Sequence, residues 1–161
     1  MTQLTVVGSI AFDAVETESG KRDRMLGGSA THFSLASSFF ADTRVVGPVG
    51  EDFGEAEFAV LRDRGVNTDD IERVAGGKTF FWSGRYERDV NVRHTLQTDL
   101  NVFEAFDPKL SEASAAARFT ALDSMNLWID IAREASDSFG AKVSKTLRSV
   151  WSVWRTLTSR S

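Results

Sequence analysis

The 161-residue chain contains no cysteine, only two histidines and no long hydrophobic run. Without cysteine there are no disulfide bonds, no zinc–thiolate site and no thiol nucleophile, and this fits a reducing cytoplasm, where we expect the protein to act. Because His32 and His94 are the only histidines in the sequence, we do not expect a histidine-rich metal centre. Apolar runs such as 39–41 fall far short of the ~18 residues that span a bilayer. The N-terminus lacks a basic segment followed by a long apolar one, so we expect neither membrane insertion nor secretion.

The chain does contain ample apolar bulk and an uneven distribution of charge. Apolar residues make up 42% of the chain, and 12 Phe and 4 Trp supply enough volume for one folded core. The formal net charge is −4, but residues 136–161 carry five basic side chains against one acidic side chain. Residues 1–135 therefore hold 14 basic and 22 acidic side chains. Such an acidic body repels phosphate, so nucleic acid is not an expected partner.

Strand-like and helix-like segments alternate along the first 65 residues. The pattern predicts buried strands over 3–10 and 43–47 and helices over 30–40 and 52–64. Ser29 is the expected N-cap of the first helix, which follows a glycine pair, and Gly65 is the expected stop of the second. Strands separated by helices in this order predict a parallel sheet with right-handed crossovers.

The middle of the chain changes to extended segments joined by turns. Residues 11–26 read as a hairpin with its turn at Ser19–Gly20, and 78–87 and 92–103 read as a second hairpin around 88–91. The predicted fold class is therefore a three-layer α/β body with a small β lid built from these hairpins. Residues 118–126 begin as a further strand, and residues 127–135 begin as a helix.

An ordered set of motifs resembles the PfkB/ribokinase family of carbohydrate and nucleoside kinases. The matching segments are Val6-Val7-Gly8-Ser9-Ile10 with Asp13, Gly27-Gly28-Ser29-Ala30-Thr31, Val45 to Gly54 (VVGPVGEDFG), Leu61 to Val66 (LRDRGV), Gly77-Lys78-Thr79-Phe80 and Asp123 to Ile129 (DSMNLWI). The resemblance implies a ribokinase-like parallel sheet with a small β lid. It also implies an ATP-dependent kinase that transfers the γ-phosphate to a sugar hydroxyl, with ATP and Mg²⁺ as its cofactors.

The chain also departs from the family pattern. A strand and helix expected between Leu110 and Arg118 are absent, and the Gly-Ala-Gly-Asp run that carries the family's catalytic base does not occur. We therefore assign no catalytic residue and expect a truncated form, incomplete at its C-terminal half and inactive alone. The expected parts are a substrate and lid portion over 1–112, a remnant strand and helix over 113–135, and a basic amphipathic tail helix over 136–161.

Five residues are candidates for binding a sugar or nucleoside-like substrate: Asp13, Gly27, Gly28, His32 and Asn126. A carboxylate at a strand end can accept two hydrogen bonds from sugar hydroxyls. A glycine pair permits close approach of the backbone and exposes N–H groups at a helix start. His32 stands where the family usually has Asn. Asn126 follows a strand, where ligands gather in open α/β sheets. The alternatives are a turn cap for Asp13, a tight turn for the glycines and a half-buried polar residue for His32.

Several other residues receive a structural interpretation. Phe80 and Trp82 share one face of a strand and are expected to pack in the sheet. Arg85 and Asn91 flank a hairpin tip, where they either cover a sugar or remain solvated, and His94 is expected to be exposed. The sequence holds no Walker loop, and no G-x-G-x-x-G turn separates the first strand from the first helix, which excludes the dinucleotide-binding motif.

The tail supports a second hypothesis about function. Apolar residues from Phe139 to Leu157 recur at helical spacing among basic residues. Such a helix could cover the body, dock on a partner, lie at a membrane surface or be unselected read-through sequence. The alternative to a kinase is therefore a non-catalytic interaction module that uses the tail and an exposed sheet. Self-association through an open sheet edge is a further expectation.

Overall fold

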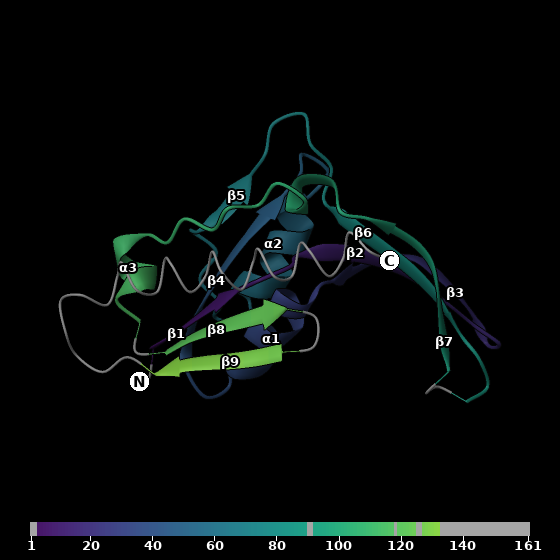
Figure 1. The fold of residues 1–161 in the computed structure, drawn as a ribbon, viewed down its shortest axis with the longest axis horizontal. Helices are drawn as coiled ribbons and strands as arrows, with labels where there is room; N and C mark the ends of the chain where they lie inside the picture. The colour runs from purple at the N-terminus through teal and green to yellow at the C-terminus, as the bar shows by residue number, and fades with distance from the viewer. Residues whose placement is uncertain (1–2, 90–91, 118, 125–126, 133–161) are drawn as a thin grey trace.

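The computed structural model describes residues 3–89, 92–117, 119–124 and 127–132, the last two ranges as backbone only (Figure 1). A five-stranded sheet forms the body, in the order β5-β4-β1-β8-β9. Its strands are β1 (Gln3–Val7), β4 (Asp42–Val49), β5 (Ile71–Arg73), β8 (Phe119–Ser124) and β9 (Leu127–Ala132). Strands β5, β4, β1 and β8 are parallel to one another, and β9 is antiparallel to β8.

Helical segments cover both faces of this sheet, which gives the expected three layers. Helices α1 (Ser29–Ser37) and α2 (Glu55–Arg62) pack on the face that presents Val6 and Val45. The opposite face presents Val7 and Val46 to a segment that contains η1 (Asn101–Phe103) and α3 (Glu112–Ala115). Consecutive strand residues point to opposite faces, so the two valine pairs account for both cores.

A second sheet of four strands forms the lid, in the order β3-β2-β6-β7. It contains β2 (Ala11–Thr17), β3 (Gly20–Gly27), β6 (Phe80–Tyr86) and β7 (Arg93–Asp99). Both predicted hairpins are confirmed, and the first turns at Glu18–Ser19, one residue earlier than expected. The two hairpins join through a parallel pairing of β2 with β6. In Figure 1 the lid extends away from the body and curves, and the arrowhead of β8 points toward the lid side.

The first two helices are real but shorter than the sequence predicts. Helix α1 ends at Ser37, because the Ser37 carbonyl accepts the N–H groups of Phe40 and Ala41 in a turn that leads into β4. Its buried face consists of Ala30, Thr31 and Ser34, and the half-buried Phe33 packs against the same core. Phe40 is instead 83% exposed.

Helix α2 begins at Glu55, three residues later than expected, because Asp52 has another role. The Asp52 carboxylate accepts hydrogen bonds from the backbone N–H of Thr79 at 2.8 Å and from its hydroxyl at 2.7 Å. The same buried hydroxyl accepts the N–H of Gly50 at 3.0 Å. This cluster of Gly50, Asp52 and Thr79, which we call the Thr79 clasp, joins the loop after β4 to the start of lid strand β6.

The helix expected over 127–135 is wrong, since Leu127–Ala132 forms strand β9. It pairs with β8 from Phe119↔Ala132 to Ser124↔Leu127. Leu127, Ile129 and Ile131 alternate with Trp128 and Asp130, and this period of two fits a strand better than a helix. The strand expected over 118–126 is confirmed as β8. The predicted tail helix over 136–161 lies outside the described residues.

A polar cluster attaches α3 to the sheet. This helix lies between Leu110 and Arg118, where the expected strand and helix are absent from the sequence. The Thr5 hydroxyl donates to the Ser114 carbonyl at 2.8 Å, and the hydroxyls of Ser111 and Ser114 both donate to the Asp70 carboxylate. Arg44 donates to the Ser114 hydroxyl at 3.3 Å. The segment that replaces the expected strand and helix is therefore tied to the body by specific hydrogen bonds.

Candidate functional site

Three of the five predicted site residues meet where the body joins the lid. Asp13 lies on β2, and Gly27 and Gly28 lead from β3 into α1. A Cβ atom placed on Gly27 would lie 2.2 Å from Oδ2 of Asp13 and 2.3 Å from its Cγ. The carboxylate of Asp13 therefore rests directly on the Gly27 backbone, and glycine is the residue that leaves room for it.

Gly28 makes the sharp turn between lid and helix. Its φ of 89° lies in the region that favours glycine, and a Cβ there would be 2.4 Å from the carbonyl oxygen of Ser9. The backbone that follows β1 and the backbone that enters α1 are therefore in direct contact at Gly28. His32 follows on the first turn of α1, is exposed, and lies close enough to Asp13 for their charges to interact.

Ser9, which the sequence analysis did not single out, caps the start of α1. Its hydroxyl accepts the N–H of Ser29 at 3.2 Å, and its carbonyl accepts the N–H of Ala30 at 3.0 Å. The hydroxyls of Ser9 and Ser29 also share a hydrogen bond of 2.8 Å. The expected capping by Ser29 is therefore wrong, because Gly28 is the N-cap residue and the cap comes from Ser9. Two N–H groups that the sequence suggested for a ligand are already used.

The Asp13 carboxylate is half-buried and accepts no hydrogen bond from any residue that the structure describes. Burial raises the pKa of this carboxyl above its ordinary value of 3.8, and the charge of His32 lowers the pKa by a smaller amount. A carboxylate without a protein partner is unfavourable in such a place. It is, however, the arrangement that a pair of substrate hydroxyls can complete.

This pKa shift predicts that Asp13 lowers the stability of the fold at neutral pH. A carboxyl with a raised folded pKa contributes stability below its unfolded value of 3.8, and the contribution is lost as the pH rises through the folded pKa. We therefore expect Asp13→Asn to raise the thermal unfolding midpoint at pH 7, with a gain that shrinks as the pH falls toward 4. Thermal melts across this pH range test it, with the exposed Asp23→Asn as control. A lower midpoint for Asp13→Asn at pH 7 would show that the carboxylate is stabilising.

The remaining predicted residues lie elsewhere. Asn126 and Asn91 fall outside the described residues. Arg85 is exposed and forms an ion pair of 3.0 Å with Glu16. Strand alternation puts Arg85 on the lid face opposite to Trp82. His94 is exposed, as predicted, and its Nε2 lies 2.7 Å from the Glu87 carboxylate.

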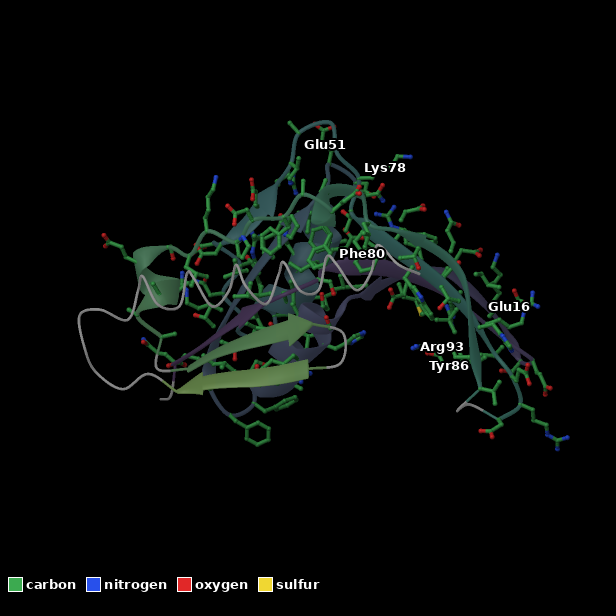
Figure 2. All side chains as sticks on the ribbon, in the orientation of Figure 1. Glu16, Glu51, Lys78, Phe80, Tyr86 and Arg93 are labelled. Atoms are coloured by element: carbon green, nitrogen blue, oxygen red, sulfur yellow. The ribbon has the colours of Figure 1, made fainter. Side chains whose placement is uncertain are left out.

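A hollow of about 370 Å³ lies at the far tip of the lid. Its walls are formed by Glu16, Thr17, Glu18, Arg85, Tyr86, Glu87, Arg88 and Asp89. Figure 2 shows Glu16 and Tyr86 near this tip and Phe80 where the lid meets the body. The hollow mixes acidic and basic side chains and includes the Glu16–Arg85 ion pair, so its charges partly satisfy one another.

The described residues hold no cluster suited to Mg²⁺, which the sequence resemblance implies together with ATP. Within that part of the chain, no group of three or more His, Asp or Glu side chains could hold a metal ion. The start of α1, the nearest helix terminus to the site, has the N–H groups of Ser29 and Ala30 bound by Ser9.

Solved kinase structures share this architecture. Ribokinase from Cryptococcus neoformans var. grubii serotype A, in complex with ADP, matches with a TM-score of 0.63 and 16% identity over 75% of this chain. Adenosine kinase from Sinorhizobium meliloti matches with a TM-score of 0.64 and 16% identity over 76% of this chain. Burkholderia thailandensis nucleoside kinase, in complex with inosine, matches with a TM-score of 0.56 and 17% identity over 71%.

These matches confirm the ribokinase-like fold predicted from the sequence motifs. The chain spans only 40%, 47% and 39% of the length of the three neighbours, respectively. No protein-family model matches the sequence, and no curated protein is significantly similar to it. At this level of identity the comparisons establish the fold, while activity and substrate have to be argued from the site.

Proposed function

We propose that the chain is the substrate-binding part of an ATP-dependent kinase of the PfkB type. It would hold a sugar-containing substrate at the junction of body and lid, with Asp13 accepting hydrogen bonds from two sugar hydroxyls. The observation that carries this proposal is the half-buried Asp13 carboxylate, which rests on Gly27 and has no hydrogen-bond partner among the described residues. The kinase neighbours in the structural comparison support the same reading.

The proposal divides binding from catalysis. Phosphoryl transfer needs an acceptor hydroxyl held in line with the γ-phosphate, a base, and groups that stabilise the developing charge. Asp13, Gly27 and Gly28 would position the acceptor, with His32 at the rim. Asn126, which lies outside the described residues, stays a proposed substrate contact. The family's Gly-Ala-Gly-Asp segment does not occur in this sequence, so we propose that the 161 residues alone bind substrate without turnover. We further propose that the chain divides into three parts, after residues 112 and 135, and that the protein acts in the cytoplasm.

The decisive test is binding of D-ribose and inosine to the full chain by isothermal titration calorimetry. One hydrogen bond to a charged group contributes roughly 1.5–3 kcal/mol, so Asp13→Ala, which removes two, should weaken binding by about 150-fold or more. Asp23→Ala is the matched control, since Asp23 lies on the same lid hairpin, exposed and paired with Lys21. Equal affinity of wild type and Asp13→Ala would assign Asp13 a structural role only. A parallel assay with ATP should detect no phosphorylated sugar, and turnover by the purified chain would contradict the division proposed above.

The interaction-module hypothesis depends on residues 136–161, which lie outside the described residues. Within the described part, no helix is long and apolar enough to cross a membrane. Both faces of the central strands are covered, so the described body offers no exposed sheet face at β1 and β4 to such a module. The described site therefore favours the kinase hypothesis over the interaction module.

A further inference from the structure

Two neighbouring phenylalanines lie exposed just after α1. Phe40 is 83% exposed and Phe39 is 66% exposed, the highest values among the large hydrophobic side chains that the structure describes. Their ring centroids lie 6.4 Å apart. The guanidinium carbon of Arg64 lies 4.2 Å from the centroid of the Phe39 ring, so this pair adjoins the end of α2. Val60, one turn before Arg64, is also exposed. We call Phe39, Phe40, Val60 and Arg64 the Phe39 patch.

The core of the body does not account for these two rings. Phe33 and Leu35, which belong to α1 itself, pack against the core beneath the helices. Phe39 and Phe40 belong to neither of the two core clusters. Apolar surface becomes more stable when it is removed from water, and a contiguous exposed apolar patch is typical of a docking surface.

The described part of the chain ends near this patch. Across β8 and β1, the strand register places Ala132, at the end of β9, level with Thr43 of β4. Three strand spacings, about 14 Å, separate these two residues, and Thr43 follows Phe40 by three positions. In Figure 1 the arrowhead of β9 lies at the end of the sheet where β1 begins. A chain of the length that separates Ala132 from Phe139 spans up to about 23–25 Å, so Phe139 is within reach of the patch.

Residues 133–161 lie outside the described residues, and their sequence is complementary to the patch. Apolar side chains from Phe139 to Leu157 recur at helical spacing, and residues 136–161 carry five basic side chains against one acidic side chain. Two exposed carboxylates border the patch, Asp42 at the start of β4 and Asp63 beside Arg64. An apolar centre with carboxylates at its border matches an apolar stripe that is flanked by basic side chains.

We propose that the Phe39 patch is the docking surface for residues 139–157 of the same chain. The apolar stripe of that segment would cover Phe39 and Phe40, and its basic side chains would face Asp42 and Asp63. A second copy of the chain would instead bring two patches with the same carboxylates together. An anionic membrane surface would be repelled by those carboxylates. The short connection from Ala132 also gives the segment a high effective concentration at the patch, which neither competitor has.

Photo-crosslinking of the full chain tests which segment covers the patch. The photoreactive amino acid p-benzoylphenylalanine is placed at position 40, and mass spectrometry identifies the peptide that it captures. We expect capture of residues 139–157 within one chain, several-fold more often than from the control position Leu96, an exposed residue of β7. Capture of a second chain, equal capture of 139–157 from both positions, or no capture of that segment would overturn the proposal.

Urea unfolding gives a second, independent measurement. A side chain that stays in water tolerates alanine, whereas a covered side chain loses buried apolar area. Phe40→Ala should therefore lower the urea midpoint by roughly 0.5 M or more, while Leu96→Ala should leave it nearly unchanged. In a chain that already carries Trp151→Ala and Trp154→Ala, Phe40→Ala should have a clearly smaller effect, because the docked segment is already weakened.

An unchanged midpoint for Phe40→Ala, or equal shifts in the two backgrounds, would contradict the docking. The proposed substrate site does not depend on this result, since Phe40, Trp151 and Trp154 take no part in it.

Discussion

Gly27→Ala is expected to reduce the affinity for ribose-containing ligands by about 10- to 150-fold. The added Cβ would lie 2.2 to 2.7 Å from all three terminal atoms of the Asp13 carboxyl group, so the carboxylate has to move. Its displacement removes one of the two charged hydrogen bonds to the ligand, which contributes roughly 1.5–3 kcal/mol. The φ of Gly27 is not in the left-handed region, so alanine is compatible with the backbone itself. The loss of stability should stay near 1–3 kcal/mol, as for other overpacked sites.

The matched control for Gly27→Ala is Gly54→Ala. Gly54 has an extended backbone with φ of −96°, and a Cβ there would meet only the flexible end of the Glu57 side chain, at 3.2 Å. Titration calorimetry on the two variants and wild type separates a site effect from a general effect of alanine. Equal affinity in all three proteins would show that the contact between Gly27 and Asp13 does not shape the binding site.

Thr79→Val is expected to lower the free energy of unfolding by about 2–3 kcal/mol. Valine keeps the shape of threonine but removes the hydroxyl that donates to Asp52 and accepts from Gly50. The N–H of Gly50 then remains buried without a partner, and the full desolvation penalty applies. Since the Thr79 clasp joins the loop after β4 to lid strand β6, the same change should loosen the lid and weaken substrate binding as well.

Urea unfolding followed by circular dichroism measures the effect of Thr79→Val. Thr95→Val is the control, because Thr95 is exposed on lid strand β7 and makes no hydrogen bond through its hydroxyl within the described part of the chain. We expect the control to change stability by less than about 0.5 kcal/mol. A Thr79→Val midpoint equal to that of the control would contradict the role assigned to the clasp.

The sequence predicted the layers and the lid because their signals are local. Short β-branched runs with paired valines marked β1 and β4, and the turn residues around 18–20 and 88–91 marked the two hairpins. The helix boundaries were less accurate, because tertiary contacts decide them. Ser9 replaces Ser29 as the cap of α1, and Asp52 is recruited by Thr79 instead of beginning α2.

The site was predicted in part for the same reason. Asp13, Gly27 and Gly28 belong to one hairpin and its exit, so the sequence kept them together and the structure brings them into contact. The position of Trp82 depends on a parallel pairing between β2 and β6, which no local pattern reports. The sequence predicted that Trp82 packs on the face shared with Phe80, and Trp82 does pack against that buried cluster. The strand β9 was mistaken for a helix although its apolar residues alternate with a period of two, because so short a run is a weak signal for either element.

A residue-by-residue NMR titration with inosine is the most direct test of the central claim, that substrate binds at the junction of body and lid. Backbone amide shifts of the ¹⁵N-labelled full chain report the location of the ligand without assuming activity. We expect the largest shifts at Asp13 and at residues 27–32. Shifts confined to the hollow at the lid tip around Glu16 and Arg88, or the same pattern of shifts in Asp13→Ala as in wild type, would contradict it.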